Sequence, residues 1–283
     1  MLRGVKIVSL ALNLPGPAAL MRCKAMGATC VKLEPPAGDP MRLYSPEAYA
    51  ALHQGVRVLG ADLKTAQGQA KLAKELTKAD IFLTSFRPSA LKRLGLDWQS
   101  LHKQFPQLSQ VAIVGGEGVA AEVAGHDLTY LAENDLITGL DLPPTLYADM
   151  GGSLMAVEAV LAATIKGQKT GVGIFQSVAL SKAAQYLALP RSWGLTKREG
   201  AVGGAHAGYQ IYKCKDGRAV VAALEPHFAA RLCALAGIEN VTMDLMMQVG
   251  TKDKLKDWFS RQTQVKLKEL ASLHDLPIHT LAV

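Results

Sequence analysis

An apolar run near the start of the chain, residues 5–12, has the composition of a strand that is buried on both faces. Pro17 suits the first turn of a helix, which we expect to continue to about Met26. Gly27 is expected to end that helix, and residues 30–34 are predicted as the next strand. A strand, a helix and a strand in this order predict a right-handed βαβ unit with parallel strands.

The same alternation continues through the first 115 residues. Further strands are predicted at residues 57–63, 81–84 and 108–114, and Thr65 is expected to cap a helix that ends near residue 78. We therefore predict an α/β fold with a doubly wound, mostly parallel, Rossmann-like sheet. The GxGxxG fingerprint of dinucleotide-binding proteins is absent after the first strand, so we predict no NAD site.

The pattern changes in the last third of the chain. Residues 151–165 predict a helix that is apolar almost all round and buried, and residues 173–179 predict a returning strand. An Asp-Gly pair at Asp216 lies between two strand-like runs, 209–214 and 219–222, which predicts an antiparallel hairpin. Amphipathic helices are expected at residues 228–236, 252–261 and 265–272. The predicted organisation is a large α/β domain at 1–189, a linker at 190–207 and a smaller α+β domain at 208–283.

Composition limits the classes of ligand. The net charge is +7 and aromatic residues make up only 6% of the chain, without any interleaved basic and aromatic run, so we predict no nucleic-acid partner. No apolar run reaches the ~18 residues of a membrane helix, and no signal pattern opens the chain, so we expect a cytoplasmic protein without a membrane partner. The four cysteines form no CxxC pair, so we predict no metal site. A small anionic ligand fits the spread positive charge.

Three titratable residues stand where loops turn into predicted helices: His126, Asp149 and Glu225. Taken singly, Asp149 is best interpreted as a helix N-cap, His126 as a histidine bonded to backbone, and Glu225 as a first-turn residue before Pro226. A carboxylate at a helix N-terminus also feels the helix dipole, which lowers its pKa. Taken together, the three residues suggest a pair of bases with a carboxylate that orients the imidazole.

Several segments resemble the class III CoA-transferase (CaiB/BaiF) family, which also contains the α-methylacyl-CoA racemases. The similarity runs from about residue 4 to 235 and includes residues 4–17, 20–34, the ADLKT segment at 61–65, and SFRP at 85–88 followed by RLGL at 93–96. Asp149 matches the aspartate that active members carry before a glycine-rich helix start. Gly125-His126-Asp127 and Leu224-Glu225-Pro226 match segments typical of the racemases.

The resemblance implies an acyl-CoA racemase that exchanges the α-proton of a 2-substituted acyl-CoA. His126 and Asp149 would act as bases on opposite faces, and Glu225 would orient His126. Two alternatives stay open: a CoA-transferase in which Asp149 is the acyl-accepting nucleophile, and a non-catalytic paralogue that binds acyl-CoA. Residues 35–36 and 53–57 depart from the family's CoA-binding segments.

The resemblance also implies a CoA thioester as substrate, without a prosthetic group. The residues expected to bind it are Ala61, Leu63, Lys64, Arg87, Arg93, Asp127 and Tyr130. Family members form homodimers in which each chain is a ring threaded by its partner. Because this chain ends where the return to the first domain would begin, we expect a homodimer with an open ring, in which Glu225 of one chain meets His126 and Asp149 of the other.

Overall fold

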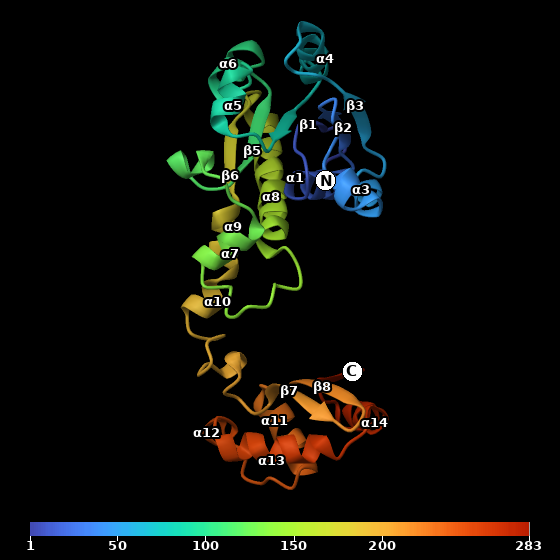
Figure 1. Ribbon diagram of the computed structural model, residues 1–283, viewed down its shortest axis with the longest axis vertical. Coiled ribbons are helices and arrows are strands. Elements are labelled where there is room, and N and C mark those ends of the chain that lie inside the picture. The colour runs from blue at the N-terminus through green and yellow to red at the C-terminus, as the bar shows by residue number, and fades with distance from the viewer. Residues whose placement is uncertain (283) are drawn as a thin grey trace. The chain divides into compact units, whose positions relative to one another are not determined.

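The protein consists of two compact units, which are described separately (Figure 1). The computed structural model describes residues 1–282. The first unit spans Met1–Ala188, and the second begins at Leu189. The predicted linker, residues 190–207, lies at the start of the second unit and includes most of α10 (Leu189–Ser192) and the 3-10 helix η2 (Ala201–Gly203).

The first unit is built on a six-stranded sheet in the order β3-β2-β1-β4-β5-β6, and all five strand pairs are parallel. The strands are β1 (Lys6–Ser9), β2 (Thr29–Glu34), β3 (Arg57–Gly60), β4 (Ile81–Thr84), β5 (Ser109–Val114) and β6 (Phe175–Ala179). This confirms the predicted doubly wound α/β fold. The strand order reverses between β1 and β4, which is the switch point where open α/β sheets bind ligands.

Alternate residues of the central strands pack on opposite faces of the sheet. Ile7 contributes to the core that covers one face, and its neighbours Val8 and Phe82 contribute to the core on the other. Helices α1 (Pro15–Ala25), α8 (Tyr147–Thr170) and α9 (Leu180–Leu187) supply the first core. Helices α4 (Ala66–Leu76), α5 (Pro88–Arg93) and α6 (Trp98–Gln104) supply the second. Shorter helical segments complete the unit: α2 (Met41–Tyr44), α3 (Pro46–Leu52), η1 (Gly118–Glu122) and α7 (Asp127–Glu133).

Two predicted elements have different boundaries for local reasons. β1 ends at Ser9, before the predicted residue 12, because the Ser9 hydroxyl accepts a hydrogen bond from the Ala11 backbone N–H at 3.1 Å and turns the chain away from the sheet. α1 begins at Pro15, two residues before the expected start. Its Gly16 is packed against the Ala11 side chain, where a Cβ atom would clash.

Helix α8 starts four residues before the prediction and ends five residues after it, at Thr170 (Figure 1). It is buried on one face only, through residues that include Ala156, Val157 and Val160, while Leu154 and Ile165 are about half exposed. The expectation of a helix buried all round was therefore wrong. Within residues 1–282, α8 is the one helix whose length and hydropathy would also suit a membrane span, and here its buried face packs on the sheet.

The second unit has the predicted α+β composition. The expected hairpin is formed by β7 (Tyr209–Cys214) and β8 (Gly217–Ala222), and a third antiparallel strand, β9 (Ile278–Leu281), pairs with β8. β9 was not predicted. Tyr212 stacks on Phe259 with ring centroids 4.6 Å apart, which joins the small sheet to α13. The helices are α11 (Pro226–Leu235), α12 (Met243–Met246), α13 (Val249–Ser260) and α14 (Gln264–His274).

Candidate active site

A pocket of about 190 Å³ opens at the switch point of the large sheet. Its walls come from the segments that follow three neighbouring strands, β1, β4 and β5, together with the starts of α7 and α8. The lining residues are Leu12, Asn13, Pro15, Ser85, Phe86, Arg87, Ile113, Val114, Gly115, Ala121, Val123, Gly125, His126, Tyr130, Asp149 and Leu180. His126 and Asp149, which were predicted to act together, therefore face one cavity.

His126 occupies the N-cap position of α7, as expected for a loop that turns into a helix there. Its backbone is extended, and its N–H donates a hydrogen bond to Thr129 Oγ1 at 3.0 Å. The His126 side chain is exposed. The imidazole is therefore accessible to a ligand, while its backbone is fixed by the first turn of the helix.

Asp149 lies within the first turn of α8, because that helix begins at Tyr147. The N-cap residue is Leu146, so the interpretation of Asp149 as an N-cap was wrong. The Asp149 backbone N–H instead donates to Oδ1 of Asp127 at 3.0 Å. Asp127 is buried, and its carboxylate supplies the capping acceptor that the start of α8 needs. This bond joins the starts of α7 and α8, the two helices that carry His126 and Asp149.

The pKa of Asp149 is raised to about 6, mainly by burial. The nearby Asp127 carboxylate raises it further, and His126 opposes both effects. The expectation that the helix dipole would lower this pKa was therefore wrong, because loss of hydration outweighs the dipole at this position. A carboxyl group that titrates near neutral pH is suited to both accept and donate a proton.

Tyr130 fills the floor of the pocket from α7. A Cβ atom at Gly115 would come within 2.5 Å of the Tyr130 hydroxyl, and one at Gly125 would come within 2.6 Å of its ring. Both glycines are thus required by the packing of this one ring. The pKa of Tyr130 is raised by burial and, to a lesser extent, by Asp149.

A second cavity of about 190 Å³ lies beyond the end of β3, and Ala61, Leu63 and Lys64 all line it. Apolar contacts from Phe86 and Leu94 complete its walls. Phe86 lines both cavities. The structure therefore brings three of the predicted CoA-binding residues together, next to the cavity that holds His126 and Asp149.

The two predicted phosphate ligands lie at opposite ends of α5. Arg87 is its N-cap and lines the first cavity, whereas Arg93 is its last residue, is exposed and lines neither cavity. Between them, Glu122 of η1 accepts hydrogen bonds from the Ser89 backbone N–H at 2.6 Å and the Ser89 hydroxyl at 2.8 Å. Sequence reasoning missed Glu122, because nothing in the sequence shows that η1 returns to α5.

A buried charged cluster behind the pocket was also missed. Lys32, Glu34, Asp39 and His53 are all buried, and the Lys32 ammonium bonds Asp39, lies 3.3 Å from Glu34 Oε1 and 2.8 Å from His53 Nε2. The two carboxylates and the imidazole are close enough together to hold a metal ion, but the lysine already supplies the positive charge at their centre. Asp39 also accepts the backbone N–H of Asn13 at 3.0 Å, so the cluster supports the β1–α1 loop.

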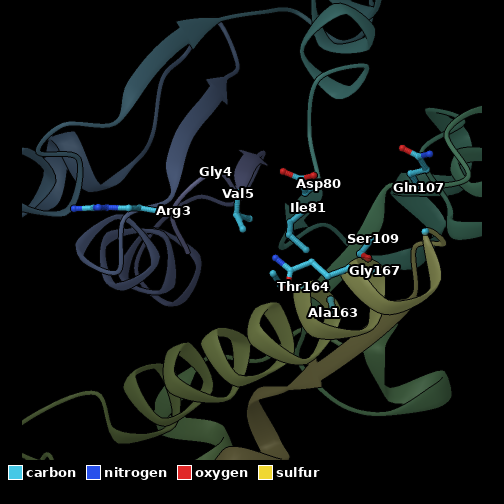
Figure 2. Close-up of a pocket in the computed structure, with 12 residues that line it drawn as sticks. Arg3, Gly4, Val5, Asp80, Ile81, Gln107, Ser109, Ala163, Thr164 and Gly167 are labelled. Carbon is cyan, nitrogen blue, oxygen red and sulfur yellow. The ribbon is translucent and has the colours of Figure 1, made fainter. Parts of the chain in front are cut away.

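A larger cavity, about 380 Å³, lies at the opposite edge of the sheet (Figure 2). It is lined by residues that precede β1, β4 and β5, including Val5 and Asp80, and by the last turns of α8 around Thr164. Ligands of open α/β sheets bind outside the carboxyl ends of the strands, and this cavity lies at the amino ends. None of the predicted site residues lines it.

Glu225 belongs to the second unit, where it is exposed and forms the N-cap of α11. As expected, it follows a strand, β8, which ends at Ala222, and it precedes Pro226. Its side chain has no hydrogen bond or ion pair within residues 1–282. Its role in orienting His126 stays a prediction.

Comparison with known proteins places the whole chain in one family. The sequence profile of CoA-transferase family III matches residues 2–282. The chain is 30% identical to α-methylacyl-CoA racemase of Mus musculus, over 94% of this chain and 73% of the racemase. It is 31% identical to succinyl-CoA:glutarate CoA-transferase of Homo sapiens, over 85% of this chain and 60% of that enzyme. One of these relatives is a racemase and the other is a CoA-transferase. The chain is about equally identical to each of them in sequence.

Solved structures show the same fold. A hypothetical protein of Mycobacterium tuberculosis superposes with a TM-score of 0.83 and 23% identity, covering 100% of this chain and 84% of that one. A CaiB/BaiF family protein of Brucella suis superposes with a TM-score of 0.80 and 24% identity, covering 99% and 84%. The match over residues 2–282 shows that the chain belongs to CoA-transferase family III.

Proposed function

We propose that this protein exchanges the α-proton of a 2-substituted acyl-CoA and so inverts the configuration of its α-carbon. One observation carries the proposal: His126 and Asp149 line the same small pocket, and the pKa of Asp149 is raised to about 6. Inversion needs a base on each side of one carbon, with each base able to return a proton. A histidine, which can both accept and donate a proton, and a carboxyl group with a pKa of about 6 meet this requirement.

The reaction begins at a C–H bond made acidic by the neighbouring thioester. Ionised Asp149 removes the α-proton, and the electron pair moves onto the thioester oxygen as an enolate. Protonated His126 then donates its proton to the opposite face of the α-carbon, and the thioester re-forms with inverted configuration. The reverse reaction exchanges the two roles. The backbone N–H of Asp127, in the first turn of α7 where N–H groups lack intrahelical partners, is our candidate to bind the enolate oxygen.

The adjacent cavities suit the two parts of an acyl-CoA. Ligand pockets commonly measure about 300–1,000 Å³, so a cavity of about 190 Å³ suits a short acyl group and not the nucleotide. The mostly apolar cavity at Ala61 and Leu63 suits the adenine ring. Arg87 is the N-cap of α5 and lines the first cavity, which supports it as our candidate for a phosphate ligand.

The second candidate is CoA transfer with Asp149 as the nucleophile. The 31% identity to a human CoA-transferase favours it. In that reaction the Asp149 carboxylate attacks the thioester carbonyl, the C–S bond breaks, CoA thiolate leaves, and an acyl anhydride remains on Asp149. The raised pKa of Asp149 opposes this reaction below pH 6, because only the ionised carboxylate is nucleophilic.

The two functions differ in whether the thioester is broken. The test is to mix the enzyme with a 2-methylacyl-CoA in deuterated water and follow deuterium at the α-carbon, free thiol, and adducts formed with hydroxylamine. We expect deuterium to enter, no thiol to appear, and no hydroxamate to form at Asp149. A hydroxamate at Asp149 together with stoichiometric thiol would establish CoA transfer instead.

His126→Ala sharpens this test. Epimerisation needs both faces, so the variant should lose racemisation while Asp149 still exchanges the proton on its own side. That remaining exchange requires the ionised carboxylate, so its rate should rise with pH and level off only at a pH above the wild-type Asp149 pKa of about 6, because the variant lacks the histidine that lowers this pKa. A His126→Ala variant that keeps nearly full activity would refute the two-base mechanism.

A further inference from the structure

The active-site pocket contains a buried amide oxygen without a partner. Asn13 Oδ1 is shielded from solvent and accepts no hydrogen bond from any of residues 1–282. Asn13 lines the same pocket as His126 and Asp149. Buried polar atoms in native proteins almost always have partners, so an exception inside a ligand pocket indicates an atom that a ligand would satisfy.

The backbone around Asn13 is fixed in an unusual conformation. Its φ angle of 64° lies in the left-handed region, which asparagine tolerates better than most residues. The Asn13 N–H donates to Asp39 Oδ1 at 3.0 Å, and Asp39 is held in turn by the buried Lys32 and by the Met41 N–H at 2.9 Å. The charged cluster thus fixes the backbone of this loop through Asp39. The Oδ1 atom of Asn13 is left without a hydrogen-bond partner among the described residues.

The chemistry of the pocket selects among possible partners. An amide both donates and accepts, and its two ends have nearly the same shape, so a hydroxyl group can pair with it in either orientation. A carboxylate is disfavoured because the pocket already holds the acidic group of Asp149, next to Asp127. A purely apolar acyl chain would leave the buried oxygen unpaired, which a binding site penalises strongly.

We infer that Asn13 determines substrate specificity by hydrogen-bonding a hydroxyl group on the acyl chain, close to the α-carbon. The substrates would then be hydroxyacyl-CoA thioesters with a branched α-carbon, rather than simple branched alkanoyl-CoA thioesters. This inference rests on the proposed function for the thioester and for the position of the α-carbon.

The test compares two ligands that differ by one hydroxyl. The full-length enzyme is titrated by calorimetry with a 3-hydroxy-2-methylacyl-CoA, in each configuration at C3, and with the 2-methylacyl-CoA of equal chain length. Deuterium exchange at the α-carbon is measured in parallel. We expect one hydroxy isomer to bind at least about tenfold more tightly than its unsubstituted analogue. In Asn13→Gly, which keeps the left-handed backbone but removes the amide, that ratio should fall to near one.

Asn240→Gly is the matched control, because Asn240 also has a left-handed φ, 53°, but is exposed in the second unit. It should keep the wild-type ratio. The inference would be overturned if the wild type bound the hydroxy and the unsubstituted acyl-CoA equally well, or if Asn13→Gly kept the wild-type ratio of the two affinities. This holds even where deuterium exchange is observed. A ratio that depends on Asn13 without any deuterium exchange would support the inference and overturn the proposed turnover. Failure of every acyl-CoA to bind would overturn both.

Discussion

Asp149 lies where a carboxyl group is poorly hydrated and close to a second acid. Burial and the Asp127 carboxylate both favour its neutral form, while His126 favours its charged form. The opposing effects leave the pKa at about 6, so both protonation states are populated near neutral pH. For proton transfer this balance is useful, because neither gaining nor losing the proton is strongly uphill.

The same pKa shift predicts how Asp149 affects stability. Because the pKa in the folded state, about 6, is above the ordinary value of 3.8, the proton is bound more tightly in the folded protein. The associated stability is therefore fully present below about pH 4 and is lost as the pH rises through 6. Asp149→Asn, which is always neutral, should be more stable than the wild type by about 1–3 kcal/mol at pH 8. The difference should shrink towards pH 4, as measured by urea denaturation.

Asp141→Asn is a suitable control, because Asp141 is an exposed aspartate in the loop that precedes α8. Its effect on the free energy of unfolding should not change between pH 4 and pH 8. If Asp149→Asn behaves in the same way, burial does not control the ionisation of Asp149.

Residues differ in how far the sequence alone could reveal them. His126, Asp149 and Glu225 could be selected because each stands at a helix start beside characteristic small residues or proline, and all three positions were correct as helix-start positions. The pKa of Asp149 could not be inferred, because hydration depends on residues far away in sequence. The unpaired amide oxygen of Asn13 could not be inferred from the sequence either, because only the folded loop buries it.

At the scale of elements, α5 carries the predicted phosphate ligands at its two ends. Only Arg87 lines a cavity, so we expect Arg87→Ala to weaken CoA binding by about tenfold in calorimetric titration. Arg191→Ala, in α10 of the second unit, serves as the control and should bind CoA as the wild type does. Equal losses in both variants would mean that CoA does not bind at the N-terminus of α5.

The contact between α7 and α8 supports a separate prediction. Asp127 caps the start of α8 through the Asp149 N–H, and it also raises the pKa of Asp149. Asp127→Ala should therefore lower the free energy of unfolding by about 1 kcal/mol and lower the pKa of Asp149 at the same time. In a His126→Ala background, one-sided deuterium exchange should then reach its plateau at a lower pH than without the substitution.

The exposed Asp141→Ala again provides the comparison, and it should change neither the stability nor the position of the plateau. A loss of stability with an unmoved plateau would show that Asp127 acts only as a cap. The two readouts thus separate the structural contribution of Asp127 from its electrostatic one.

The elements that the sequence predicted well are those buried on both faces. β2, β4 and β5 are almost entirely buried, and their positions were correct to within one residue. β9 was missed because it has only four residues, which include the polar pair His279 and Thr280. The start of α8 was misplaced because the capping carboxylate comes from Asp127, 22 residues earlier in the chain.

At the scale of the whole molecule, one apolar surface of the first unit has no cover within that unit. Met150, Leu154 and Ile165 on α8 are each at least 40% exposed, and Tyr186 on α9 is 70% exposed. Exposed apolar side chains gathered on neighbouring helices are typical of protein–protein interfaces. We propose that this surface joins two copies of the chain in a homodimer, as the family resemblance implies.

The family resemblance further implies that each active site combines residues of both chains. We predict that inactive variants will complement one another when their defects lie in different units. An Asp149→Asn chain and a Glu225→Gln chain, co-expressed with different tags and isolated as a heterodimer, should form one site with intact His126, Asp149 and Glu225. Such a heterodimer should show about half of the wild-type rate of racemisation, because one of its two sites is intact.

The matched comparison is a heterodimer of Asp149→Asn with His126→Ala. Both residues line a single pocket of the first unit, so each chain of this pair has a defective pocket and no intact site can form. It should stay as inactive in racemisation as either homodimer. A monomer at micromolar concentration in sedimentation analysis, or equal rates in the two heterodimers, would contradict a site shared between chains. Restoration only in the pair that includes Glu225→Gln would show that the second unit of one copy completes the pocket of the other.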